Sequence, residues 1–462
     1  MSTALSLIEA YRNFRQRPVP PEGHGLALFP FLLFVVIFLG SGILLTVQGH
    51  DKAFYQMPAA VAILPAIILS VLLGRVSVNK SLQQFLEGSG HLNIITMCFI
   101  YLLAGAYSEV MEAIGAVQST VNFSLRFISG FMLLPGIFIV TSFISLAMGT
   151  SMGTIAAMAP IVLEIADATG IPFSLAMGAL LGGAMFGDNL SMISDTTIAA
   201  TQTQECSMKD KFQLNFSIAL PAMVVTVLFL AIIGKPGQVA DLGSYELIKV
   251  LPYGLVLALA LLGMNVLVVL TIGILCAGIV GFMHMDSFTL LFFGQKIYAG
   301  FLKMVDILLL SLMIGGLGEM VKQQGGLAFL IHKISQIAKK VTRQDSSRII
   351  GEFGIGSLVS VVDVCTANNT VAILISGDAA REIAKKDGVE PRRAASLLDI
   401  FSCVVQGLLP YGAQILLIGS LSELSPFAIV KNNHYCLVLG GLTILAILFK
   451  YPRDIFGFKG SS

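Results

Sequence analysis

The segment from Gly187 to Thr197 holds the residues whose types and spacing best suit chemistry. It contains two carboxylates, two serines, an amide and two threonines. Oxygen atoms of these kinds bind hard cations, and a carboxylate can carry a proton instead. Asp188 and Asp195 are seven residues apart and would share one face of an unbroken helix. We therefore predict an ion site with Na+ bound at Asp188 and Asp195. Its predicted ligands are Asp188, Asn189, Ser191, Ser194, Asp195 and Thr196.

The surroundings of this cluster place it in a membrane. An apolar run rich in Gly and Ala, residues 173–186, precedes it, and the whole chain is 56% hydrophobic and only 12% charged. Continuous apolar runs predict an all-α polytopic membrane protein, whereas the strands of a β-barrel would alternate. Ionisable groups at membrane depth are costly and are found lining cavities or ion paths. The cluster is thus expected to line a transport path.

Several classes of function are excluded by what the sequence lacks. The net charge of +1 gives no reason to expect a nucleic-acid partner. We find no phosphate-binding loop, no set of nucleophile and base, and no His/Cys metal spacing. We therefore expect a transporter driven by an ion gradient, not an enzyme, with no cofactor other than Na+ as coupling ion. The six cysteines show no paired spacing and are expected to be small apolar residues.

Eight segments are candidate membrane-spanning helices on length and hydropathy. They are residues 26–47, 57–73, 92–115, 212–234, 247–263, 266–282, 301–321 and 436–450.

Two further apolar regions, 127–203 and 349–421, are interrupted by polar segments in the same order. Each has a polar break, an apolar arm, a Gly/Pro turn and a helix that is broken in turn. The breaks fall at 150–154 and 187–197 in the first region, and at 366–370 and 409–412 in the second. Corresponding features are about 216 to 219 residues apart, which predicts an internal duplication.

The length of the first interrupted region predicts a re-entrant hairpin. As one helix, residues 127–168 would be roughly 60 Å long at about 1.5 Å per residue, twice the ~30 Å hydrocarbon core. We predict a first transport repeat, 26–235, with hairpin 127–169 and broken helix 173–203. A second repeat, 247–450, would have hairpin 349–380 and broken helix 393–421. A cytoplasmic segment, 1–25, precedes these repeats, and a cytoplasmic tail, 451–462, follows them.

Loop charges predict the orientation, because Lys and Arg concentrate on the cytoplasmic side. This count places the N-terminus and the C-terminus inside, in the plasma membrane of a bacterium (the inner membrane), and makes the two repeats inverted. The residues counted were Arg12, Arg15, Arg17, Arg75, Lys80, Lys209, Lys211, Lys322, Lys333, Lys339, Lys340, Arg343, Arg348, Arg381, Lys385, Lys386, Arg392, Arg393, Arg453 and Lys459.

The hairpin tips and several buried acids supply further candidates. A substrate site or second ion site is predicted at Thr150, Ser151, Thr154, Asp363, Asn368, Asn369 and Thr370. A proton relay is predicted at Glu109, Glu112 and Asp399, although both glutamates could instead reach the outer surface.

Two motifs resemble those of a known family. The segment Gly187-Asp188-x-x-Ser191-x-x-Ser194-Asp195-Thr196-Thr197 resembles the signature of the NhaC-type Na+/H+ antiporters, and Gly149-Thr150-Ser151-x-Gly153-Thr154 resembles the element that precedes it there. Met192 departs from the family, many members of which have Pro at that position. The resemblance implies a fold of paired hairpins, coupling of Na+ to protons, and ion ligands or proton carriers at Asp188, Ser191, Ser194, Asp195 and Thr196.

Two functions stay open on the sequence. In the first, Na+ and H+ compete for Asp188 and Asp195, and alternating access exchanges the two ions. In the second, Na+ or H+ drives the symport or exchange of a small amino acid or hydroxy-carboxylate, which helix N-termini at the Asn-rich tip would hold. The expected partners are Na+, H+, the lipid bilayer and, in the second case, that solute. The family also includes malate/lactate exchangers and amino-acid permeases, so the resemblance does not settle the substrate. Monomer and homodimer are equally compatible with the sequence.

Overall fold

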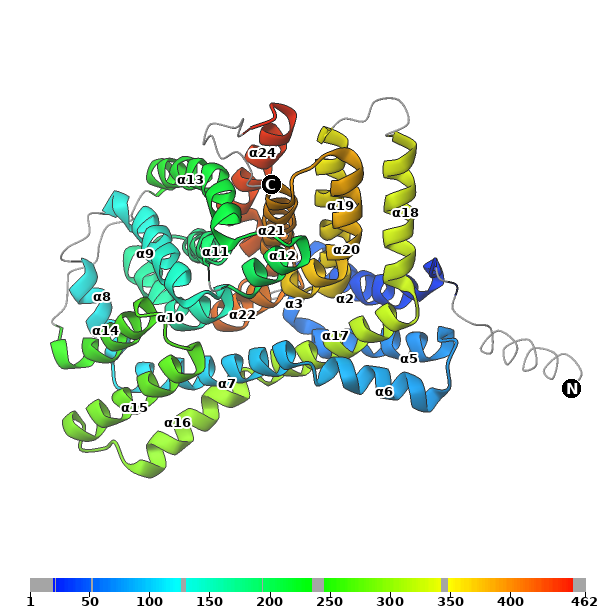
Figure 1. Ribbon diagram of the computed structural model, residues 1–462. Helices are drawn as coiled ribbons and strands as arrows, with labels where there is room; N and C mark the ends of the chain where they lie inside the picture. The colour runs from blue at the N-terminus through cyan, green and yellow to red at the C-terminus, as the bar shows by residue number, and fades with distance from the viewer. Residues whose placement is uncertain are drawn as a thin grey trace, which may run out of the picture.

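The computed structural model describes residue 20 and residues 22–50, 53–125, 130–192, 194–234, 245–341 and 348–451. These parts of the chain are helical and contain no strand (Figure 1). Most of the expected N-terminal segment, the first three residues of the first expected hairpin and all but one residue of the expected tail lie outside the described residues.

Each of the eight expected spans contains a helix. These helices are α2 (Phe29–Val47), α5 (Leu64–Leu73), α7 (Leu92–Ala113), α13 (Met208–Ile233), α14 (Leu247–Leu261), α15 (Val266–His284), α17 (Val305–Gln323) and α24 (His434–Leu448). Within the described residues, seven helices are long and apolar enough to cross a membrane, or eight if one bent pair counts as a single span. The prediction of an all-α polytopic membrane protein is confirmed.

Other helices are either short pieces within expected segments or helices that were not expected, because they are short or carry more polar residues. They are η1 (Gly25–Leu28), α3 (Ala53–Gln56), α4 (Ala59–Ala62), α6 (Val78–Ser89), α8 (Ala116–Leu125), η2 (Gly130–Met132), α16 (Leu290–Lys303), α18 (Gly326–Val341) and α23 (Pro426–Asn432). Helix α16, most of which was not expected, meets α17 at a 44° bend. Gly300 of α16 packs on Gly105 of α7 so closely that a Cβ on Gly105 would lie 2.2 Å from the Gly300 carbonyl oxygen.

Both interrupted regions form a pair of helices joined by a tight turn. The first pair is α9 (Leu133–Met148) and α10 (Ser151–Thr169), and the second is α19 (Arg348–Thr366) and α20 (Asn369–Asp387). Gly149 turns the first with φ 69°, and Ala367 turns the second with φ 50°. Both values lie in the left-handed region, which glycine adopts freely and alanine does not. Re-entry of these pairs from opposite sides of a bilayer stays a prediction.

Each helix pair is followed by a broken helix. The first consists of α11 (Phe173–Leu190) and α12 (Asp195–Gln204), and the second of α21 (Pro391–Leu408) and α22 (Ala413–Ser422). Four residues separate the two halves in both cases, 191–194 and 409–412. Each break therefore leaves backbone groups at a helix end without an intrahelical partner, and these groups are free to bind other atoms.

Three pairs of corresponding helices in the two regions begin at one fixed distance in sequence. The starts of α10 and α20, of α11 and α21, and of α12 and α22 are each separated by 218 residues. The same spacing relates the positive-φ pairs Gly149 and Ala367, Gly170 and Gly388, and Glu205 and Glu423. A constant register of this kind is what a duplicated unit retains.

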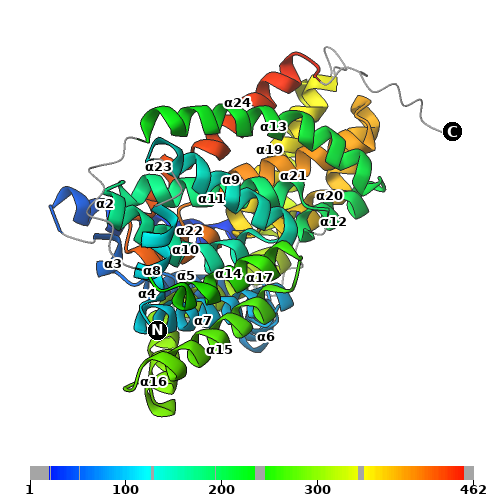
Figure 2. The ribbon, with the colours of Figure 1, turned by 90° about the vertical axis from the view of Figure 1, so that its left-hand side faces the viewer.

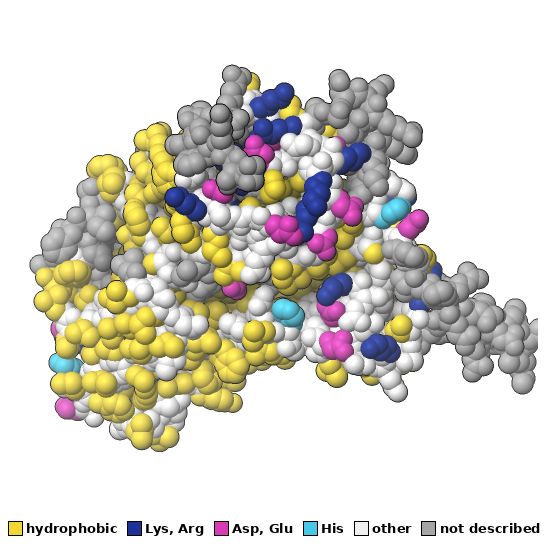
Figure 3. Space-filling view, in the orientation of Figure 1, with side chains coloured by type: hydrophobic (Ala, Val, Ile, Leu, Met, Phe, Trp, Pro, Cys, Tyr) yellow, Lys and Arg dark blue, Asp and Glu magenta, His cyan; other side chains and the backbone are white. Residues whose placement is uncertain are grey.

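The two regions interlock. Helix α12 of the first packs on hairpin helix α20 of the second, and α22 of the second packs on α10 of the first, as Figures 1 and 2 show. Each break is thereby brought to the hairpin of the other region. The face over α14, α15 and α16 is largely hydrophobic, whereas charged side chains gather at the opposite upper right (Figure 3). Exposed apolar residues there include Leu275, Ile279, Leu290 and Leu291, a surface suited to lipid.

Candidate functional site

A cavity of about 320 Å³ lies where the two hairpin tips and the two helix breaks meet. The first half of the chain contributes Thr150, Ser151, Asp188, Ser194, Asp195 and Thr196. The second half contributes Asn368, Asn369, Thr370, Gln406, Ala413 and Gln414, and the start of α7 closes one side with Asn93 and Thr96. Among the described residues that line it there are two carboxylates and no Lys, Arg or His. The cavity is therefore suited to a positively charged occupant.

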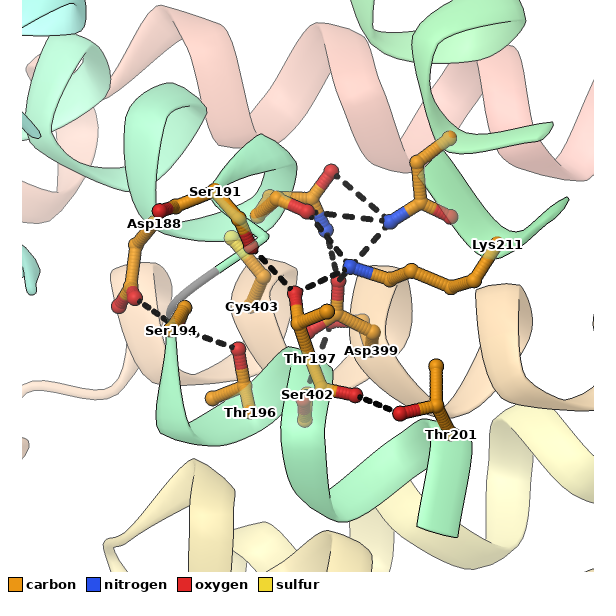
Figure 4. Close-up of polar contacts among 12 residues, drawn as sticks. Asp188, Ser191, Ser194, Thr196, Thr197, Thr201, Lys211, Asp399, Ser402 and Cys403 are labelled. Atoms are coloured by element: carbon orange, nitrogen blue, oxygen red, sulfur yellow. Dashed lines mark hydrogen bonds and ion pairs between the residues drawn. The ribbon is translucent and has the colours of Figure 1, made fainter. Parts of the chain in front are cut away.

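Asp188 is the most tightly held acid of the cavity. Its side chain is 6% exposed, in the last turn of α11. Ser151 Oγ, at the start of α10, donates to Asp188 Oδ2 at 2.7 Å, and Ser194 Oγ, in the break, donates to Oδ1 at 2.6 Å. Figure 4 shows Asp188 and Ser194 facing each other, with Thr196 3.0 Å beyond Ser194. A carboxylate can accept about four hydrogen bonds, so lone pairs remain for a cation.

Asp195 lines the same cavity from the other side of the break. It is exposed, and it occupies the first position of α12, where the helix dipole favours an acid. The spacing of the two acids suggested that they share one face of a helix. They do not, because the break at 191–194 places them on two different helices. The folded chain nevertheless brings both to one cavity.

The second half supplies amides where the first supplies acids and hydroxyls. Gln406 follows Asp188 by 218 residues, and its Nε2 donates to Gln414 Oε1 at 2.8 Å and to the Ala367 carbonyl at 3.2 Å. Gln414 Nε2 donates in turn to Ser151 Oγ at 3.1 Å. A continuous chain of hydrogen bonds thus runs from the second hairpin tip to Asp188. Sequence analysis missed both glutamines, although the 218-residue register would have found Gln406.

Four of the residues predicted for the ion and substrate sites lie outside the cavity lining, as do the three predicted for a proton relay. Ser191 Oγ donates to the Leu146 carbonyl at 2.9 Å, and Thr154 Oγ1 to the Thr150 carbonyl at 2.9 Å, so both hydroxyls serve the backbone. Asn189 Nδ2 donates to Asp399 Oδ2 at 2.9 Å, on the far side of α11. Asp363 is fully buried in α19, and neither of its carboxylate oxygens has a hydrogen-bond partner in the described chain.

Asp399 forms a buried ion pair that the sequence did not reveal. Lys211 Nζ lies 2.5 Å from Asp399 Oδ2, and the two side chains are 1% and 0% exposed. Counting Lys211 among the loop charges was wrong. Lys211 lies in the first turn of α13. Its long side chain is buried and reaches the end of α11 (Figure 4).

The two glutamates expected to relay protons are not brought together. Glu109 is buried and pairs with Lys303 of α16, while Lys296 lies 3.6 Å from its Oε2. Glu112, one turn away, is exposed. Neither lines the cavity.

Comparison with known proteins agrees with the motifs. The profile of the Na+/H+ antiporter family matches residues 24–235, which include both motifs. The Na(+)/H(+) antiporter NhaC of Bacillus subtilis (strain 168) is 23% identical over 424 residues, 84% of this chain and 89% of that protein. This chain is similar to the NhaC-type Na+/H+ antiporters. The resemblance predicted from the sequence is thereby confirmed.

Proteins similar to this chain also include exchangers of organic solutes. The Malate-2H(+)/Na(+)-lactate antiporter of Bacillus subtilis (strain 168) is 30% identical over 224 residues. That match spans 48% of this chain and 47% of the relative, about half of each. The Arginine/ornithine antiporter ArcD of Halobacterium salinarum (strain ATCC 700922 / JCM 11081 / NRC-1) is 21% identical, with 96% of each chain covered.

Proposed function

We propose that this protein is a secondary active transporter that exchanges Na+ for H+ across a bacterial inner membrane. Na+ and the proton compete for the carboxylates of the cavity, above all Asp188. The Na+ ligands are drawn from Asp188, Ser151, Ser194, Asp195 and Thr196, with Thr150 beside them. The proposal excludes the side chains of Ser191 and Thr154 as ligands, because neither residue lines the cavity.

One observation carries this proposal. Asp188 is buried, yet it lies on the cavity wall at the one point where a hairpin tip and a helix break both donate hydroxyls to it. A carboxylate at membrane depth needs a cation, a proton or hydrogen-bond donors to offset its desolvation. Movement of the Ser151 tip away from the Ser194 break would remove one of those donors. Ion occupancy at Asp188 is thereby linked to the relative position of the two repeats.

The arrangement of repeats belongs to the same proposal. The two regions 127–203 and 349–421 are inverted copies, their helix pairs enter the bilayer as re-entrant hairpins, and both termini lie in the cytoplasm. The constant register of 218 residues and the reciprocal packing of α12 on α20 and α22 on α10 support this arrangement. Inverted repeats with broken helices at the bilayer midplane provide the two gates that alternating access requires.

Purified protein in proteoliposomes that contain a pH-sensitive dye tests the exchange. Addition of Na+ alone should move protons. At pH values where the carboxylate is mostly protonated, the apparent KM for Na+ should rise about tenfold for each unit by which the pH falls, because a protonated ligand cannot bind the metal. Asp188→Asn should abolish the response. Asp378→Asn, an exposed acid on α20, is the matched control and should retain it. Full activity of Asp188→Asn would refute the site.

A second candidate function is the exchange of a small organic solute. The cavity is about 320 Å³, at the lower end of the usual range for small-molecule pockets and far more than one Na+ ion fills. Amides from Asn368, Asn369, Gln406 and Gln414 could hold neutral parts of such a solute. Since two acids and no basic residue line the cavity, a cationic amino acid fits better than a dicarboxylate. The test offers labelled arginine, ornithine, malate and lactate to proteoliposomes that give no dye response to Na+. Uptake of one of these solutes would identify this function.

A further inference from the structure

A second group of oxygen atoms surrounds a positive charge at the end of half-helix α11. Lys211 Nζ donates to the Asn189 carbonyl at 2.8 Å, to Thr197 Oγ1 at 2.7 Å and to Asp399 Oδ2 at 2.5 Å. These three oxygens come from α11, α12 and α21. Figure 4 shows Lys211 reaching Thr197 and Asp399, away from Asp188 and Ser194. The ammonium group is therefore held as a cation in an oxygen-lined site outside the cavity.

The break in the helix creates this site. The helix α11 ends at Leu190, so the Asn189 carbonyl belongs to its last turn, whose carbonyls are satisfied from outside the helix. Carbonyls at the end of a helix carry partial negative charge, and the unwound ends of broken helices are places where transporters bind their coupling ion. Lys211 fills such a place with a charge that belongs to the chain.

The duplicated half shows which parts of this site are scaffold and which are special to it. Asn433 donates to the Gly407 carbonyl at 2.8 Å, and Asn215, 218 residues earlier, donates to the Asn189 carbonyl at 3.2 Å. The counterpart of Lys211 in this register is Ile429. Only the first half therefore combines the helix end with an ammonium and a carboxylate.

The site offers more oxygen atoms than the ammonium uses. Asp399 Oδ1 and Asn215 Oδ1 are buried and have no hydrogen-bond partner in the described part of the chain. Asn215 Nδ2 donates to Asp399 Oδ2 at 2.9 Å, so these two side chains already touch. An ammonium has three hydrogens and satisfies three acceptors, whereas a metal ion takes as many oxygens as fit around it.

We propose that this is an alkali-cation site, of the kind that takes Na+, and that Lys211 is its tethered occupant. The protein thus holds one fixed cation at Asp399 and exchanges another at Asp188. The fixed charge neutralises Asp399 and ties α11, α12 and α21 together whatever the state of the cavity. The proposal rests on the proposed function only in treating Asp188 as the exchangeable site.

Removal of the tethered charge should turn the site into one that binds free Na+. The test measures the melting temperature of purified protein in detergent with NaCl or with choline chloride. In Asp188→Asn, which lacks the exchangeable site, the two salts should give the same value. In Asp188→Asn/Lys211→Ala, Na+ should raise the melting temperature by several degrees over choline, because a ligand that binds only the folded state stabilises it. Adding Asp399→Asn should abolish this rise.

The controls separate this proposal from the proposed function. Lys211→Met/Asp399→Asn, made in the Asp188→Asn protein, removes both charges together and should fold without gaining a Na+ response. An Asp188→Asn/Lys211→Ala protein that is folded but indifferent to Na+ would overturn the proposal, and so would one that cannot be recovered folded even in Na+. A Na+ response that persists in Asp188→Asn alone would instead count against Asp188 as the exchangeable site. The effect of Lys211→Ala is then the further rise in melting temperature that Na+ produces in the double variant.

Discussion

The side chain of Asn433 donates to the backbone carbonyl of Gly407 at 2.8 Å, 26 residues earlier in the chain. Asn215 makes the same contact with Asn189, again across 26 residues. Both asparagines donate a hydrogen bond to a carbonyl in the last turn before a helix break, where carbonyls must be satisfied from outside the helix. A break inside a membrane is stable only if such groups are satisfied. The scaffold that both regions share therefore includes the means of stabilising its breaks, while the charged groups around them differ between the two regions.

Loss of either hydroxyl that holds Asp188 should weaken Na+ binding. Ser151→Ala and Ser194→Ala each remove a proposed oxygen ligand of Na+ that also holds Asp188 in place. Interactions of a hydroxyl with a charged group are worth about 1.5–3 kcal/mol, so we expect at least a tenfold rise in the apparent KM for Na+. The dye assay in proteoliposomes gives this KM from a Na+ titration.

Thr154→Val is the matched control for these serine variants. Its hydroxyl lies in the same hairpin but bonds to the Thr150 backbone outside the cavity lining, so its KM should stay near that of the wild type. Equal effects of all three substitutions would mean that the hairpin is merely sensitive to mutation, and that Ser151 and Ser194 have no special role.

The hydropathy of the chain predicted most of the fold, because the apolar side chains that give a segment its high hydropathy are the ones that folding removes from water. The eight spans and both helix pairs could be placed in this way, and a polar break in an apolar run located each tip. The bend between α16 and α17 could not, because it depends on tertiary packing of α7 against Gly300. No Pro or Gly marks the junction at Met304.

The site was predicted in part for a similar reason. Asp188 and Ser194 stand out as polar residues in an apolar context, and the fold brings them to Ser151. Lys211 resembles an ordinary loop charge next to a span, and only its partner Asp399, on a distant helix, shows otherwise. Gln406 carries no charge and gives no signal by itself. Composition thus identifies acids at membrane depth, whereas their partners require the fold.

Ala367 should be replaceable by glycine with a gain in stability. Its φ of 50° is one that an L-residue adopts at a cost of about 1–2 kcal/mol, part of which the greater entropy of unfolded glycine cancels. We expect Ala367→Gly to stabilise the protein by roughly 0.5 kcal/mol, measured from its thermal unfolding midpoint in detergent. The reverse change at the equivalent tip, Gly149→Ala, should destabilise by about 1 kcal/mol. Shifts of the same sign at both tips would contradict this account.

The contact of α16 with α7 should tolerate no side chain at Gly300. A Cβ there would lie 2.3 Å from the Gly105 carbonyl oxygen, so Gly300→Ala must push the helices apart, at a cost of about 1–3 kcal/mol. Gly294 lies on the same helix with nothing within 4 Å of an added Cβ, and Gly294→Ala should be neutral or stabilising by up to ~1 kcal/mol. Thermal unfolding of both variants compares the two positions, and equal losses would rule out close packing as the cause.

Glu109 distinguishes a proton relay from a structural ion pair. As a relay residue it would have to pass protons to the cavity, so Glu109→Gln would stop transport. In the structure its carboxylate pairs with Lys303 and lies outside the cavity lining, between α7 and α16. We therefore expect Glu109→Gln to keep Na+-dependent proton movement near the wild-type rate but to lower the melting temperature, because the ion pair between the buried Glu109 and the exposed Lys303 is lost. Lys303→Gln should lower it similarly. A folded Glu109→Gln protein without antiport would favour the proton relay over the structural ion pair. Loss of an ion pair remote from the cavity gives no reason for transport to stop.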